Sequence, residues 1–433
     1  MKNFALTITL LTIMVACTND IDEIVESDKN NYVINDCQNW RSYDEALTIA
    51  EESISILDNG KSLTRGSKQR HIEKGYQAVA ICRDKNSTRS AKAEYNDTLM
   101  YVFNFSDNQG FAVVSASPDT EGLIAITEKG NYNPSDSTNN SGLDLFMNLA
   151  KKYVEYASRS SKGHVIIDRP KQLIDSIVNN EEYLGPYVSV KWGQNYPEGI
   201  YCPNNISGCT NTAIAQIMSY YEYPSSISLT YSGADVSSQY LNWSTIKQHI
   251  ISATNQSEHS SCAATNETHN IIGRLCRQIG QLTGSDYTSN EYTGTQYSNI
   301  ILALQALGYN TGNWTNYSNG LSSVCANIRN NHIYMIYGQS IYNYHLWLLD
   351  GVYTHEHGNI SWTQELGSTV MELYEYNVTT DRYYHFNWGK DGIGNGYFLA
   401  NVFNSKKAYM SDGIPAPLNI DYANDVNLLN VYR

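Results

Sequence analysis

The sequence predicts an α+β protein in which a small α+β domain precedes a larger domain made of a helical half and an antiparallel sheet half. Helical periodicity over 209–222, 270–284 and 298–307 predicts the helical half. Apolar and aromatic runs in the last third of the chain predict the sheet half, at 332–340, 344–352, 370–378, 382–389 and 395–403. Helices followed by a run of strands are typical of the α+β class, and the seam between two such halves favours a ligand cleft.

The chain before residue 160 contains the patterns of the smaller domain. Ser42 begins a helical pattern to residue 57, and Glu45 completes a capping box with it. The other elements expected here are two strands within 99–117 around a turn at 106–110, a third strand at 121–127 and a helix at 143–159. We expect an N-terminal domain over 37–160 and a C-terminal domain over 161–433, and the polar link 158–164 is a candidate site for proteolysis.

Composition and charge exclude several classes of function. The chain has 433 residues, of which 41% are hydrophobic and 17% charged, as in folded proteins. Its net charge is −14 and no Lys/Arg-rich run stands out, so we expect no nucleic acid as a partner. There is no CxxC pair, and we expect neither a metal nor a cofactor.

The first residues have the pattern of an export signal. A lysine and a short apolar run lead to Cys17, and we interpret 1–17 as a lipoprotein signal in which Cys17 is lipidated. An ordinary secretion signal with a chance cysteine is the alternative, and export is expected in both cases. The acidic stretch 18–36 is a candidate flexible tether. We therefore expect a protein of the bacterial cell envelope or surface that contacts the membrane only through its lipid, unless processing releases the mature form.

The remaining cysteines, apart from Cys209, leave the disulfide state open. An exported chain can hold disulfides, but the spacings here are irregular and indicate no particular pairing. The six candidates are Cys37, Cys82, Cys202, Cys262, Cys276 and Cys325.

Cys209 is a candidate nucleophile. It follows Gly208 and directly precedes the helical pattern that Pro224 ends, so it should lie at a helix N-terminus. Backbone amides and the helix dipole at that position favour a thiolate, the reactive form of cysteine. The alternative is a small buried hydrophobic residue, which is what most free cysteines are.

A thiolate nucleophile needs a base, and the base needs a group that orients it. His345 opens an apolar strand, while Asn387 offers an amide that can accept the ring N–H of a histidine. His345 lies 136 residues after Cys209, within the distance of about 130–150 seen in papain-type proteases, and Asn387 lies 178 residues after it. We assign the excess to an insert at 353–382, whose two histidines we interpret as surface residues of a turn-like stretch.

Four stretches together resemble the streptopain family of bacterial cysteine peptidases. They are VKWGQNYP with YCPNN, GCTNTAIAQIMSYYEYP, YHLWLLDGV and HFNWGKDGIGNGYF. The stretch YVFNFSDNQGFAVVSASPDTEGLIAITEKGNY resembles the inhibitory prodomain of the same family. The likeness spans nearly the whole chain after the signal.

The resemblance implies a papain-like fold with two subdomains behind an inhibitory prodomain, and a cysteine endopeptidase that is made as a zymogen. It implies Cys209 as the nucleophile, His345 as the general base and acid, and Asn387 as the group that orients His345. Trp388 would shield that contact, and Gln194 would hold the oxyanion together with the Cys209 amide. The expected partners are protein or peptide substrates and the chain's own prodomain as an intramolecular inhibitor.

Two departures from the family pattern concern specificity more than chemistry. Leu346 stands where a small residue is usual, and Lys390 with Asp391 replaces a second tryptophan in the glycine-rich turn. Two other functions stay open for the same residues. One is acyl transfer of the transglutaminase type, and the other is a surface lipoprotein that binds a partner with an inactive cleft.

Overall fold

A computed structural model describes the fold. It covers residues 40–58, 70–72, 79–82, 98–133, 140–157, 173–250, 266–339, 344–364, 371–403 and 426–433. The expected signal, the tether and the link 158–164 lie outside these residues. Among the described helices none is long and apolar enough to cross a membrane.

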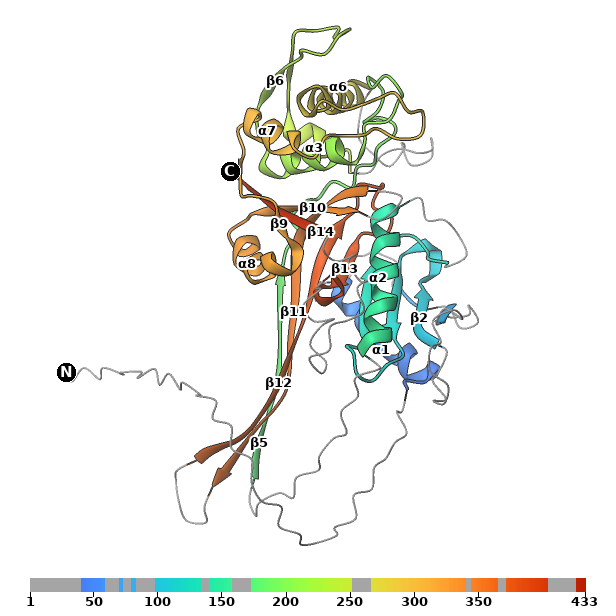
Figure 1. The fold of residues 1–433 in the computed structure, drawn as a ribbon, viewed down its shortest axis with the longest axis vertical. Coiled ribbons are helices and arrows are strands. Elements are labelled where there is room, and N and C mark those ends of the chain that lie inside the picture. The colour runs from blue at the N-terminus through green and yellow to red at the C-terminus, as the bar shows by residue number, and fades with distance from the viewer. Residues whose placement is uncertain are drawn as a thin grey trace, which may run out of the picture. The chain divides into compact units, whose positions relative to one another are not determined.

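One large antiparallel sheet contains strands of both expected domains (Figure 1). Its main path runs β1-β2-β3-β4-β13-β12-β11-β10-β14-β8, while β5 pairs with β11 and β9 pairs with β14. The strands are β1 (Val79–Cys82), β2 (Thr98–Asn104), β3 (Phe111–Ser115), β4 (Leu123–Thr127), β5 (Leu173–Leu184), β8 (Asn310–Thr311), β9 (Thr315–Asn316), β10 (Ile333–Gln339), β11 (Tyr344–Gln364), β12 (Met371–Asn387), β13 (Gly396–Leu399) and β14 (Val426–Tyr432). Strands β6 (Ser226–Ser228) and β7 (Ser238–Tyr240) form a separate pair.

The helices confirm most of the helical periodicity. They are α1 (Tyr43–Asp58), α2 (Ser141–Ala157), α3 (Cys209–Tyr221), α4 (Trp243–Ile246), α6 (Asn266–Thr283), α7 (Asn299–Ala306) and α8 (Tyr317–Arg329), with short 3-10 turns η2 (Ser106–Asn108) and η3 (Ala400–Phe403). The expected capping box forms at the start of α1. The Ser42 amide donates to the Glu45 carboxylate at 2.7 Å, and the Glu45 amide donates to the Ser42 hydroxyl at 3.3 Å. The α+β class is therefore confirmed.

Two apolar cores lie on opposite faces of β10, because neighbouring residues of a strand point to opposite sides. Ile336 belongs to a core that also contains the buried residues of β2 to β4, α2, α8 and η3. Met335 belongs to a second core, with α3, α6 and α7. Figure 1 shows these three helices gathered together beyond β10. The expected helical half thus packs on the sheet half through the second core.

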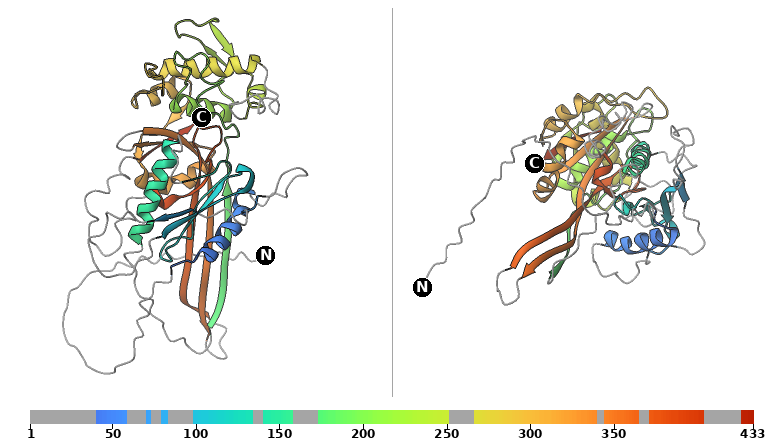
Figure 2. Two further views of the ribbon diagram at one scale, coloured as in Figure 1. Left: turned by 90° about the vertical axis from the view of Figure 1, so that its right-hand side faces the viewer. Right: turned by 60° about the horizontal axis from the view of Figure 1, so that its bottom comes forward.

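The stretch 353–382, expected as an insert, extends two strands of the sheet, and the turn expected around its two histidines is wrong. β11 and β12 pair continuously as far as Gln364 and Met371, and β5 pairs along the other edge of β11 (Figure 2). His355 and His357 consequently lie within β11 rather than in a turn. The run alternates polar side chains with aromatic and β-branched ones, which suits a strand exposed on both faces.

Three of the cysteines left open by the sequence are free thiols in the structure. They are Cys202, Cys276 and Cys325, of which the first two are buried. Burial, with smaller contributions from Glu198 and Cys202, raises the pKa of the Cys276 thiol well above its usual value. Cys37 and Cys262 lie outside the described residues.

Candidate active site

Cys209 is the first residue of α3, as its sequence pattern predicts. Gly208 before it has a φ of 89°, in the region that favours glycine, and a Cβ there would lie 3.0 Å from Cβ of Thr293. The amide of Ser207 donates to the backbone oxygen of Gln194 at 2.7 Å. The approach to Cys209 is therefore fixed by a glycine turn and by the segment that contains Gln194.

His345 lies next to Cys209 at the start of β11. The amide of the following residue, Leu346, donates to the Cys209 sulfur. The imidazole is 4% exposed, and its Nε2–H donates to the backbone oxygen of Trp388 at 2.9 Å. The structure thus brings the predicted nucleophile and the predicted base to one place, with the base hydrogen-bonded to a carbonyl.

Asn387 ends β12 and uses its side chain elsewhere. Its Oδ1 accepts from the Gly389 amide at 3.2 Å and from Nε2 of Gln216 at 3.3 Å, and its Nδ2 donates to the backbone oxygen of Val190 at 3.0 Å. The predicted hydrogen bond from His345 to Asn387 is not among these contacts. Gln216 is a residue that the sequence reasoning missed, although it lies in the nucleophile helix two turns after Cys209.

Trp388 is fully buried against the same site. Its indole N–H donates to the backbone oxygen of Gly394 at 2.9 Å, and its amide donates to Oδ1 of Asn395 at the same distance. The glycine-rich turn therefore holds the indole ring, while its expected role as a shield of a His345–Asn387 contact stays a prediction. Trp347 lies on it with ring centroids 4.9 Å apart.

The electrostatics of the site describe an uncharged pair. Burial raises the pKa of the Cys209 thiol, and the amide and hydroxyl hydrogen bonds and the Lys390 charge offset this only in part. Burial also lowers the pKa of His345 to about 4, although the hydrogen bond to the Trp388 carbonyl has the opposite effect and raises it. The helix N-terminus alone predicted a thiolate at Cys209, but the raised pKa of this half-buried thiol and the lowered pKa of His345 favour the uncharged forms of both groups.

A helix of the N-terminal domain covers these residues. Gly142 is the second residue of α2, and a Cβ on it would lie 2.5 Å from a ring carbon of Trp388 and 2.8 Å from Cδ2 of His345. Asn140 accepts the Leu143 amide at 3.1 Å and so satisfies one orphan donor at the start of this helix. The sequence reasoning missed Gly142, although its position just inside the start of a helical pattern is a signal for a close backbone approach.

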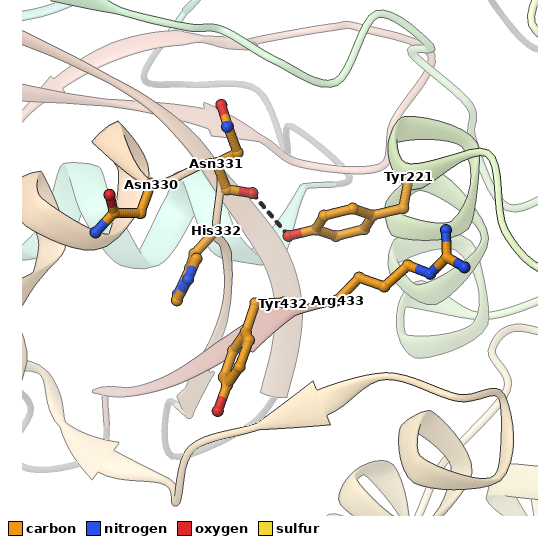
Figure 3. Close-up of a pocket in the computed structure, with 6 residues that line it drawn as sticks. All are labelled: Tyr221, Asn330, Asn331, His332, Tyr432 and Arg433. Atoms are coloured by element: carbon orange, nitrogen blue, oxygen red, sulfur yellow. Dashed lines mark hydrogen bonds between the residues drawn. The ribbon is translucent and has the colours of Figure 1, made fainter.

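A separate cavity of about 380 Å³ lies away from Cys209 (Figure 3). It is lined by Tyr221, Asn330, Asn331, His332, Tyr432 and Arg433. Tyr221 is the last residue of α3 and Cys209 is the first, so the length of the helix, roughly 18 Å at 1.5 Å per residue, separates them. We assign this cavity no part in the chemistry at Cys209.

Comparison with known families gives matches over both parts of the chain. Residues 190–398 match the Peptidase C10 family model, and residues 29–154 match the Spi protease inhibitor model. These matches define a cysteine peptidase preceded by an inhibitor domain, which is the organisation of a zymogen. The chain thus contains a peptidase domain of the Peptidase C10 family, the streptopain family of cysteine peptidases, behind a Spi-type inhibitor domain. The domain boundaries expected from the sequence stay predictions.

Comparison with individual proteins adds a solved structure. A mutant fragment of prointerpain A from Prevotella intermedia is similar, with a TM-score of 0.48 and 17% sequence identity, over 81% of this chain and 98% of that chain. No curated protein matches the chain.

Proposed function

We propose that the protein is an exported cysteine endopeptidase in which Cys209, His345 and Asn387 perform the reaction. The sulfur of Cys209 attacks the carbonyl carbon of a peptide bond. His345 takes the thiol proton and gives it to the leaving amine, which leaves a thioester on the sulfur. Water activated by His345 then attacks this thioester, so that the second product departs as a carboxylic acid and the thiol is restored.

One observation carries this proposal: the fold brings the start of α3, with its thiol, to the start of β11, with its imidazole, and the N-terminal domain lies against that imidazole. The hydrogen bond from the Leu346 amide to the Cys209 sulfur supports the first part. The close approach of Gly142 to the rings of His345 and Trp388 supports the second part. A nucleophile and a base under a removable domain are what a latent peptidase requires.

Latency in this proposal has an electrostatic basis as well as a steric one. A reactive pair needs a thiolate and an imidazolium, but the pKa shifts of the half-buried thiol and the buried imidazole favour their uncharged forms in the covered site. Removal of the N-terminal domain takes Gly142 away from the rings of His345 and Trp388 and admits water, which gives the His345 ring room to turn toward Asn387. The uncovered site then favours the charged pair.

We assign the oxyanion contact to Gln194 together with the Cys209 amide. The support is a pair of hydrogen bonds between Gln194 and Ser207, which lies two residues before Cys209. The amide and the hydroxyl of Ser207 donate to the backbone oxygen of Gln194 at 2.7 and 3.2 Å. The export step and the lipid on Cys17 rest on the sequence of residues 1–17 alone. They place the peptidase at the cell envelope or surface, where proteins and peptides are its substrates.

Replacement of the sulfur tests the proposal. The full chain and its Cys209→Ala variant are incubated with casein, with and without a thiol reductant. We expect casein cleavage and loss of the N-terminal domain in the parent chain, and neither in the variant. Cleavage of casein by the folded variant would show that another group is the nucleophile.

A further inference from the structure

A second contact between the two domains lies beside the candidate active site and consists of four ionisable side chains. Glu128 of the N-terminal domain forms an ion pair with Nζ of Lys191, and its other carboxylate oxygen lies 3.4 Å from Nε2 of His385. Nδ1 of His385 lies 2.6 Å from Asp350, whose second oxygen accepts the Val188 amide at 2.8 Å. The charges therefore alternate along a continuous chain of contacts.

Most of this contact is removed from water. Asp350 is fully buried, and the side chains of His385 and Glu128 are 3% and 16% exposed, while that of Lys191 is 32% exposed. Burial on its own lowers the pKa of His385, but Asp350 and Glu128 outweigh it and raise that pKa to about 9. Burial raises the pKa of Glu128, and His385 with Lys191 outweighs it and holds that pKa far below its usual range. Both groups are charged at neutral pH.

Strand pairing places Glu128 at this position. β4 pairs with β13, with Thr127 opposite Gly396 and Ala125 opposite Phe398. The Glu128 amide continues the pairing to the backbone oxygen of Asn395 at 2.7 Å. β13 is the edge strand that the C-terminal domain offers to β4, so the carboxylate arrives at the end of a strand that has been added to the sheet.

We propose that the β13 edge, with Lys191 and His385 at its end, is a holding site for a strand that ends in a carboxylate, and that β4 with Glu128 occupies it in the zymogen. The holding site is separate from the blocking contact of Gly142 on His345 and Trp388. The N-terminal domain is thus attached to the C-terminal domain at the holding site and obstructs the candidate active site at Gly142. This proposal rests on the proposed function, since it names how the latent form of that peptidase is kept closed.

The chemistry selects a carboxylate at this site. Two cationic groups face one position, and the second anion, Asp350, is already committed to His385 and to the Val188 amide. An amide in place of the Glu128 carboxylate leaves the Lys191 ammonium without this anion and leaves the buried His385 with Asp350 alone, which is costly in a site of this burial. A strand that lacks the carboxylate is consequently held less firmly.

Hydrogen exchange in an inactive full chain tests the proposal. The Cys209→Ala background prevents self-processing, and peptides from β4 and β13 report the strand pairing. We expect Glu128→Gln and Lys191→Met each to speed exchange in both strands about tenfold or more, and the double variant to exceed either single one only slightly. The matched control is Glu182→Gln, which removes an exposed ion pair to Arg329 with 46% of the Glu182 side chain exposed, and should leave β4 and β13 unchanged.

The outcomes separate cleanly. Unchanged exchange in β4 and β13 in a folded Glu128→Gln variant, or equal acceleration in the β10–β14 pairing, would overturn the holding site. If Glu128→Gln does not fold, Lys191→Met decides by the same criterion, because Lys191 is partly exposed. The casein assay tests the proposed function separately. If that function is wrong, casein cleavage fails, while hydrogen exchange in the inactive chain is unaffected.

Discussion

Gly142 is the residue at which the N-terminal domain meets the imidazole and the indole of the site. Any side chain here would occupy the space of the Trp388 and His345 rings, since even a Cβ would lie within 2.5 Å of the first and 2.8 Å of the second. We predict that Gly142→Leu displaces α2 and uncovers Cys209, so that iodoacetamide labels the thiol of the full chain several-fold faster.

Asn148→Leu is the control for this prediction, because Asn148 is an exposed residue of the same helix. Its labelling rate should equal that of the parent chain. Equal rates in both variants and the parent would show that α2 does not restrict access to Cys209.

Gln194 is the residue whose assigned role depends on the transition state. If its side chain donates to the developing oxyanion, Gln194→Ala should lower kcat by about 10²–10³ with little change in KM. Steady-state kinetics on a peptide substrate, after processing of the variant by a trace of parent enzyme, measure this. A decrease of less than about threefold would remove Gln194 from the oxyanion site.

At the residue scale the sequence predicted positions better than partners. Cys209 and His345 are predictable because a helix start and an alternating strand are local patterns. The contacts of Asn387 with Gln216 and Val190 were not predictable, since they join segments 171 and 197 residues apart in the chain. The neutral state of the thiol depends on burial, which a helix start does not reveal.

Helix α3 presents the thiol at its first residue, and the turn at Gly208 determines the direction in which the chain enters this helix. Gly208→Ala should destabilise the fold by about 1 kcal/mol from its positive φ and by more from contact with Thr293, and should also lower activity. Gly233→Ala is a matched control, since Gly233 has a φ of 85° and open space around its Cβ. Thermal unfolding and kcat compare the two. Equal losses would mean that crowding at Gly208 has no part in positioning Cys209.

Elements with a strong local pattern were predicted, and those held by distant pairing were not. β5 contains the polar run Asn179-Asn180-Glu181-Glu182, which has weak strand propensity and is ordered as an edge strand along β11. Strand pairing of the same kind makes 353–364 and 371–382 continuations of β11 and β12. A strand of this kind can be predicted from the sequence only when the strand that pairs with it is already known.

At the scale of the whole molecule, the two domains share one sheet and one buried chain of charges. The groups that face His385 are Asp350, Glu128 and the ring of Tyr397, whose centroid lies 5.2 Å away. Because its pKa is raised from an ordinary 6.5 to about 9, the stability from its charge is complete below pH 6.5 and is lost as the pH rises through about 9.

We therefore predict that the thermal unfolding midpoint of the inactive Cys209→Ala chain falls steadily between about pH 6.5 and pH 9 and levels off above that range. His385→Gln should lack this step, because it has no proton to lose in that range. A parent profile that stays flat to pH 10 would contradict a charged His385 in the zymogen.

Mass spectrometry of the intact protein after treatment with iodoacetamide at neutral pH is the most direct test of the account as a whole. Samples taken before and after processing are compared, and the modified cysteine is located by peptide mapping. We expect slow labelling of Cys209 in the full chain and rapid labelling of Cys209 once the N-terminal domain has been removed. Rapid labelling of Cys209 in both forms, or of another cysteine in its place, would contradict a nucleophile that is kept latent by its own inhibitor.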